Sequence, residues 1–294
     1  MQRIVPNLWF DHNAAEAADF YTAAFGDARV VETVRYPSEG LLDFQTEFAG
    51  QVLTVEFEIG GYRFIGINAG SEFRPNPSVS FFVNFDPSVD ADARQHLDEL
   101  WAALSEGGKA LMPLQEYPFS PHYGWIEDRY GVSWQLMLTN ADGEPRPFII
   151  PSVMFGYTAQ GRAAEAIEYY TSVFGGRVGS VVPYPAEAGP MAAQVMFGDF
   201  QLLDQWFATM DAADQDFTFS CGVSLMVYCD GQDELDHYWS QLSAVPAAEQ
   251  CGWCADKFGL SWQLIPANLG ELMAKPDAYD KLMGMKKIEI AAFG

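Results

Sequence analysis

The chain is poor in cysteine and histidine, and it has no long apolar run. Four cysteines among 294 residues are too few for a disulfide-stapled scaffold, and a chain of this length needs no such staples. The apolar runs fall well short of the ~20 residues that cross a bilayer. The first residues are typical of a strand rather than a signal peptide. We therefore expect a cytoplasmic protein that does not enter a membrane.

Basic residues are also scarce. The 16 Lys and Arg stand against 40 Asp and Glu, which gives a formal net charge of −24. Both halves share this excess, with 22 acidic and 9 basic residues in 1–147 and 18 and 7 in the remainder. Such a surface repels phosphate backbones and anionic lipid, so we expect neither nucleic acid nor a membrane as a partner. With 49% hydrophobic and 15% aromatic residues, the composition predicts a packed globule.

An internal repeat organises the sequence. The segment 124–136 (GWIEDRYGVSWQL) recurs at 252–264 (GWCADKFGLSWQL), with eight of thirteen positions identical. A second match joins 16–26 to 165–175, where apolar residues follow the spacing of one helix face and a glycine ends the helix. A third joins 97–104 to 235–242, again at helical spacing. The chain is therefore a tandem duplication.

The sequence pattern of the first half predicts two helices among several strands. The helices are expected at about 14–26 and 91–106, and the strands at 4–10, 29–36, 42–48, 52–59, 62–68, 79–85, 111–117, 125–128 and 133–138. This order is β-α-β-β-β given twice, with an extra strand in the first unit, and it indicates an α+β fold. Asp-Gly and proline at 142–147 mark a linker, so we expect domains at 1–141 and 148–294. The second domain ends in a short helix and a tail with no counterpart in the first.

The opening strand, the Asn-x-x-Glu-Ala helix that ends in Phe-Gly, and the repeated block resemble the PhnB-like family, also described as the 3-demethylubiquinone-9 3-methyltransferase domain. That family is part of the vicinal oxygen chelate superfamily of glyoxalases, bleomycin resistance proteins and dioxygenases. The resemblance implies a tandem repeat of glyoxalase-like units, each made of two β-α-β-β-β modules whose curled mixed sheets enclose a cup. Single-unit relatives commonly form dimers. We therefore expect a monomer with an internal pseudo-dimer, or a weak homodimer.

The superfamily's chemistry implies a divalent metal held by histidine and carboxylate side chains. This sequence departs from that pattern. The first strands, 4–10 and 150–156, contain no His, Asp or Glu, and Gln135 and Gln263 stand where active relatives carry a ligating Glu. An amide is a weak neutral ligand. Of the four histidines, two lie on predicted helices, His12 lies near a helix start and His122 on a predicted loop. We expect no metal and no cofactor.

Other motifs of catalytic chemistry are also absent. Cys251 and Cys254 have the Cys-x-x-Cys spacing of redox and zinc sites, but the repeat aligns them with a strand entry that has no thiols. Core cysteines are the favoured interpretation. No Gly-x-Gly-x-Gly turn opens a helix after the first strand. The sequence therefore lacks the S-adenosylmethionine-binding motif that would support a methyltransferase activity. The catalytic residues, if there are any, stay unknown.

Strand alternation separates Trp134 from Gln135, so Trp134 is expected to face the helices and Gln135 the cup. The sequence predicts a protein that binds a small organic metabolite without a tight metal. The alternative is a metal-dependent or acid–base enzyme of the same superfamily, a lyase, dioxygenase or group transferase, in which Glu116 and Glu249 act as acid and base. The residues expected at the ligand are Asn7, Glu116, Trp125, Gln135, Ser152, Glu249, Trp253 and Gln263.

Overall fold

The computed structural model describes residues 2–294, apart from the side chain of Phe44. The first half contains β1 (Ile4–Phe10), α1 (Ala14–Ala24), β2 (Ala28–Arg35), β3 (Val52–Ile59), β4 (Tyr62–Asn68), β5 (Val79–Phe85), α2 (Ala93–Ser105), β6 (Lys109–Tyr117), β7 (Ser120–Glu127) and β8 (Ser133–Leu138). The second half contains β9 (Ile149–Phe155), α3 (Ala163–Phe174), β10 (Arg177–Pro183), β11 (Val195–Leu202), β12 (Gln205–Asp211), β13 (Val223–Cys229), α4 (Gly231–Leu242), β14 (Trp253–Ala255), β15 (Ser261–Pro266), α5 (Leu269–Met273) and α6 (Ala278–Met283).

Both β-sheets run through both halves of the chain. The seven-stranded sheet has the order β14-β15-β13-β1-β4-β3-β2, and the eight-stranded sheet has the order β10-β11-β12-β9-β5-β8-β7-β6. The halves meet where β1 pairs antiparallel with β13 and where β5 pairs antiparallel with β9. The first module of each half thus continues the sheet of the second module of the other. The α+β tandem prediction is confirmed, and the two units form an internal pseudo-dimer.

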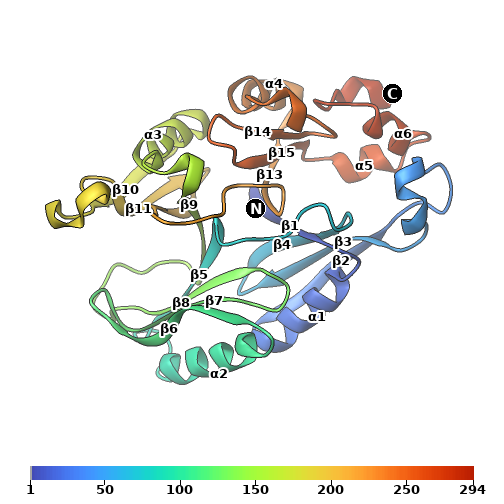
Figure 1. Ribbon diagram of the computed structural model, residues 1–294. Coiled ribbons are helices and arrows are strands. Elements are labelled where there is room, and N and C mark those ends of the chain that lie inside the picture. Colours follow the sequence, from blue (N-terminus) through green and yellow to red (C-terminus); the bar gives the residue numbers. More distant parts are fainter. Residues whose placement is uncertain (1) are drawn as a thin grey trace.

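The helices lie on the outside of this arrangement. In Figure 1, α1 and α2 lie at the bottom of the view and α3 and α4 at the top, with the strands between them. Helix α1 packs on β2, β3 and β4 and buries Ala14, Ala17, Ala18 and Tyr21, and α3 buries the matching set that ends in Tyr170. Small alanines on the buried face let each helix lie close to its sheet.

The repeated block forms the same buried hydrogen-bond network in both halves. Buried Asp128 accepts hydrogen bonds from Trp134 Nε1 at 2.9 Å and from the Tyr21 hydroxyl at 2.8 Å. Its other oxygen accepts two backbone N–H groups of the turn that follows. Asp256 receives the same four bonds, with Trp262 and Tyr170 as its side-chain donors. Because these bonds join the helix to the last strand, the block holds the fold together.

The predicted strand 42–48 is wrong. Asp43–Phe48 form a 3₁₀ helix, in which the Thr46 hydroxyl donates to the Asp43 carbonyl at 2.9 Å. Phe48 is buried between Tyr36 and His12, stacked at ring-centroid distances of 5.2 and 4.6 Å. This local packing draws the segment away from the sheet, and the first module keeps the plain β-α-β-β-β order. His122 also differs from expectation, since it lies on β7 rather than on a loop.

The second half has no strand that corresponds to β6, and the C-terminal tail occupies its place. The N–H groups of Cys251 and Gly252 donate to the carbonyls of Met285 and Lys286 at 2.8 and 2.7 Å. In the first half the residue matched to Cys251 is Tyr123, which lies opposite Gln115 of β6. Two buried tail side chains, Ile288 and Phe293, anchor this segment. The tail therefore covers an otherwise open sheet edge.

Candidate functional site

Each sheet has one face turned away from the helices, and we name these faces cup A and cup B. Cup A, on the seven-stranded sheet, carries Asn7, Glu56, Arg63, Ser224, Met226, Trp253 and Gln263. Cup B, on the eight-stranded sheet, carries the matching positions Ser152, Asp199, Trp206, Ser80, Phe82, Trp125 and Gln135. Every cup therefore combines residues of both halves.

The alternation of β8 and β15 determines which side chains reach the cups. Trp134 is fully buried against Tyr21 of α1 and Phe25, which follows that helix, at ring-centroid distances of 5.5 and 5.1 Å. Gln135, the next residue, consequently lies on the opposite face. Trp262 and Gln263 repeat this relation in the other sheet, where Trp262 packs against the aromatic residues of α3.

The structure brings six of the eight predicted ligand residues together in two groups of three. Cup A holds Asn7 with Trp253 and Gln263, and cup B holds Ser152 with Trp125 and Gln135. The other two do not join them. Glu116 is exposed on the edge strand β6. Glu249 accepts from Ser243 at 2.8 Å and pairs with Lys286 of the tail at 3.0 Å, and these contacts lower its pKa.

Cup A contains buried amide groups without partners among the described residues. Asn7 is 2% exposed, and neither its Nδ2 nor its Oδ1 has a hydrogen-bond partner. Gln263 is 6% exposed; its Nε2 donates to the Cys251 carbonyl at 3.4 Å, while its Oε1 has no donor. The two residues lie on β1 and β15 with β13 between them, so their backbones are about 10 Å apart across the sheet. A buried polar atom without a partner costs about 1–3 kcal/mol, which a bound ligand could recover.

A charged pair and apolar walls complete cup A. Arg63 Nε donates to Glu56 Oε1 at 2.7 Å, and this contact raises the pKa of Arg63. The guanidinium also lies 5.4 Å from the ring centroid of Tyr228. The sequence could not indicate these three residues, because alternation gives their face but not which strands become neighbours. The remaining wall is apolar: Ile65, Ile67, Met226 and Ile265.

Cup B is filled by its own side chains. Gln135 accepts from the Tyr123 hydroxyl at 2.6 Å and donates to Ser80 Oγ at 2.8 Å, so its amide has partners at both ends. Burial raises the pKa of Tyr123, which keeps the proton on that hydroxyl. An apolar cluster surrounds this network: Phe82, Met112, Tyr117, Tyr123, Trp125, Met137, Ile150, Phe197, Trp206, Ala208 and Met210.

The linker contributes a further side chain, Arg146, that covers part of cup B. The Arg146 guanidinium lies 4.2 Å from the ring centroid of Trp206, and its Nη2 donates to Asp199 at 2.9 Å. Stacking on a tryptophan face together with an ion pair to a buried carboxylate is a favourable arrangement for arginine. In cup A the position of Trp206 is taken by Arg63, which belongs to the sheet itself.

The residues of neither cup fit the divalent metal that glyoxalase-type folds imply. Within residues 2–294 the structure has no group of three or more His, Cys, Asp and Glu side chains that could hold a metal ion. The buried polar groups of cup A are two neutral amides and a hydroxyl, and the carboxylates of Glu56 and Glu58 are already paired with Arg63 and Arg29. His122 points to Asp98 of α2, with Nε2 and Oδ1 2.6 Å apart, outside the cups.

The Cys-x-x-Cys pair has the surroundings of core cysteines. Cys251 and Cys254 are both buried, and burial raises the pKa of Cys254 to about 12. The Cys251 thiol donates to the Leu282 carbonyl. A thiol with a raised pKa is a poor nucleophile and a poor metal ligand at neutral pH, so this pair lacks the low pKa that reactive thiols have.

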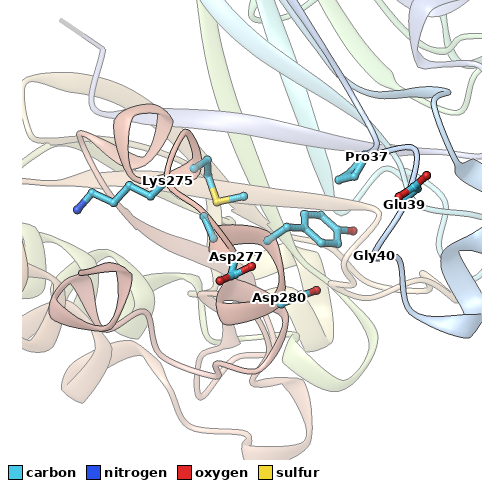
Figure 2. Close-up of a pocket in the computed structure, with 9 residues that line it drawn as sticks. Pro37, Glu39, Gly40, Lys275, Asp277 and Asp280 are labelled. Atoms are coloured by element: carbon cyan, nitrogen blue, oxygen red, sulfur yellow. The ribbon is translucent and has the colours of Figure 1, made fainter.

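Two surface hollows lie where the C-terminal segment docks. Figure 2 shows the smaller, about 230 Å³, with Pro37, Glu39 and Gly40 on one side and Asp277 and Asp280 on the other. Nearby, the Tyr279 hydroxyl donates to Gln45 at 3.0 Å and joins α6 to the first half. The larger, about 640 Å³, lies at the start of α4, where Gln232 bonds the tail through Ile288 and Ile290. In the larger hollow, the Gln232 amide is thus engaged by the tail.

Comparison with known proteins supports this architecture. The family model described as 3-demethylubiquinone-9 3-methyltransferase matches residues 2–137 and 147–265. A PhnB protein from Bacillus cereus is 34% identical over 47% of this chain and 100% of its own, with a TM-score of 0.40. Glyoxalase I from Zea mays is similar in fold, with 12% identity, coverage of 91% of this chain and 93% of that chain, and a TM-score of 0.54. No curated protein matches. No helix within residues 2–294 is long and apolar enough to cross a membrane.

Proposed function

The chain belongs to the 3-demethylubiquinone-9 3-methyltransferase (PhnB-like) family of the glyoxalase-type superfamily, and on that premise we propose that it binds a small organic metabolite in a sheet-lined cup, without a tightly bound metal. One observation carries the proposal. The amides of Asn7 and Gln263 are buried on one sheet face with three polar atoms unpartnered. Native proteins rarely leave buried polar groups without partners, and functional sites are the usual exceptions.

Several features favour binding over catalysis. The two carboxylates expected to act as acid and base, Glu116 and Glu249, lie outside the cups, and Glu249 is engaged by Lys286. Glu56, a carboxylate within cup A, is engaged by Arg63. The methyltransferase in the family's description has no supporting S-adenosylmethionine motif in this sequence. Neither of the two residues expected to act as acid and base therefore lies where a substrate would bind.

The proposal extends to assembly and location. Because each half already supplies the pairing surface of the other, we propose a monomer or at most a weak homodimer. The four free cysteines suit a reducing compartment such as the cytoplasm.

A metabolite screen read by thermal shift and tryptophan fluorescence tests the proposal. At least one uncharged organic compound should raise the melting temperature of the protein. It should also change the tryptophan fluorescence, because Trp253 lies at cup A. Elemental analysis of the same preparation should give no stoichiometric zinc, nickel, iron or manganese. Binding of no library compound would contradict the proposal, and a stoichiometric metal would favour the enzyme alternative.

A further inference from the structure

The two cups are related by the duplication, so their residues can be compared position by position. The pairing registers equate Asn7 with Ser152, Gln263 with Gln135 and Ser224 with Ser80. The glutamines and the serines are thus retained in both cups. What differs is the set of residues around them.

The residue before the repeated block differs between the cups in side chain and in backbone, since Cys251 has a left-handed φ of 50° and Tyr123 lies on β7. In cup B the Tyr123 hydroxyl donates to Gln135 Oε1, and in cup A the repeat has Cys251 at that position. The Cys251 thiol is turned to the Leu282 carbonyl of the C-terminal segment instead. In the same cup Ser224 Oγ accepts from Trp253 Nε1 at 3.3 Å, whereas Ser80 Oγ accepts from Gln135. Gln263 Oε1 is therefore left free to accept a donor.

The linker makes the second difference. Arg146 follows the first half and covers Trp206 and Asp199 in cup B. The corresponding pair in cup A is Arg63 and Glu56, which bond to each other within the sheet and take no side chain from a linker. The linker thus adds a side chain to cup B and none to cup A, and the one hydroxyl of cup B that lacks a partner is Ser152 Oγ.

We propose that cup A alone takes the ligand, one molecule per chain, and that the ligand is an uncharged compound with a hydrogen-bond donor and an acceptor on an apolar body. The proposal rests on the ligand-binding function proposed above. Gln263 Oε1 and Asn7 Oδ1 require donors and Asn7 Nδ2 requires an acceptor, a pattern that a carboxamide supplies. Ile65, Ile67 and Ile265 offer apolar surface for the body.

Charge disfavours an anionic ligand. The side of cup A beyond β1 carries three carboxylates, Glu32, Glu56 and Glu58, and three guanidinium groups, Arg29, Arg35 and Arg63, a balance of 3 − 3 = 0. Arg29 pairs with Glu58 and Arg63 with Glu56, while Arg35 donates to the Gly50 carbonyl. The whole chain adds a net charge of −24. An anionic ligand is therefore disfavoured by the charge of the whole chain rather than by a local excess of carboxylates.

Entry requires side chains over the amides to move, because the unpartnered atoms are covered in this structure. Met226 lies beside Gln263 in the sheet and is 8% exposed. Methionine has three rotatable bonds and adapts its shape readily, so Met226 is the side chain that we expect to move first.

The test is calorimetric titration of the full chain with benzamide, compared with benzoate and ethylbenzene. We expect benzamide to bind one molecule per chain, and benzoate and ethylbenzene to bind at least about tenfold more weakly, since each lost hydrogen bond or unfavourable charge costs roughly that factor. Asn7→Ala and Gln263→Ala should each weaken benzamide binding about tenfold. Ser152→Ala, the matched change in cup B, should leave it unchanged.

A second set of variants tests the exchange at position 251. Cys251→Tyr restores the tyrosine of cup B and should abolish benzamide binding, whereas Cys251→Ser should retain it; near-ultraviolet circular dichroism checks that both fold. Two molecules per chain, or a loss of binding on Ser152→Ala but not on Asn7→Ala, would overturn the assignment to cup A and leave the proposed function standing. Equal or absent binding of the three probes would overturn the ligand class. The metabolite screen tests the proposed function separately.

Discussion

Gln135 and Gln263 occupy the same position of the repeat but have different hydrogen-bond partners. Gln135 satisfies the Tyr123 hydroxyl and Ser80, whereas Gln263 Oε1 has no donor. Gln135→Leu should lower the free energy of unfolding by about 1–3 kcal/mol, because it leaves buried polar groups unpaired. Gln263→Leu should change it by less than about 1 kcal/mol, because it removes an unsatisfied atom. Urea denaturation of the two variants measures the difference, and equal losses would contradict the asymmetry of the cups.

The cysteines give a second residue-scale prediction. Burial raises the pKa of Cys229 and Cys254 to about 12 and raises that of Cys221 and Cys251 as well. Since the thiolate is the reactive form, the native chain should react slowly with a thiol reagent at neutral pH, and faster as the pH rises. Unfolding in guanidinium should make all four thiols reactive toward the reagent at once. A rapidly reacting Cys251 or Cys254 in the native protein would reopen the redox interpretation.

Part of the candidate site could be predicted from the sequence. Alternation along the last strands separated Trp134 from Gln135, and the repeat carried this relation to Trp262 and Gln263. It gave no sign of Arg63 and Glu56, because their place in cup A depends on β1 joining β13 from the far half of the chain. Such a pairing is non-local, and no short-range pattern encodes it.

At the scale of elements, the C-terminal tail acts as a substitute edge strand. Its carbonyls bond Cys251 and Gly252, and Ile288 is fully buried. The sequence showed the tail as an unmatched addition, but not that it fills the place of β6. Likewise, the apolar residues of 42–48 resemble a strand, and only the stacking of Phe48 on Tyr36 and His12 makes them a 3₁₀ helix.

Removal of residues 285–294 should therefore lower the melting temperature and increase the binding of a hydrophobic dye. Ile288→Ala should produce a milder form of the same defect, at about 2–5 kcal/mol for a lost buried isoleucine. The change Lys281→Ala, at a partly exposed residue, serves as the control, because it leaves the tail's backbone bonds and buried side chains in place. Unchanged stability of the truncated chain would show that the tail does not cover the sheet edge.

At the scale of the whole molecule, the two halves depend on each other because both sheets cross between them. We expect separately produced fragments 1–141 and 148–294 to self-associate or aggregate, since each exposes the open edges of two strands. Mixed together, they should form a one-to-one complex that elutes like the intact chain. Light scattering of the intact protein should give a mass near 32.6 kDa, with at most a weak dimer. Stable monomeric fragments, or an obligate tetramer of the whole chain, would contradict the pseudo-dimer as the unit of folding and assembly.

The most direct test of the account is a ¹H–¹⁵N correlation spectrum of the full chain with benzamide added. The indole N–H of Trp253 lies 3.3 Å from Ser224 in cup A, and that of Trp125 lies 2.6 Å from Ser133 in cup B. The account expects shifts of the Trp253 indole and of the Gln263 and Asn7 side-chain amides, with Trp125 and Gln135 unmoved. Shifts confined to Trp125 and Gln135, or no shift at any of these groups, would contradict it.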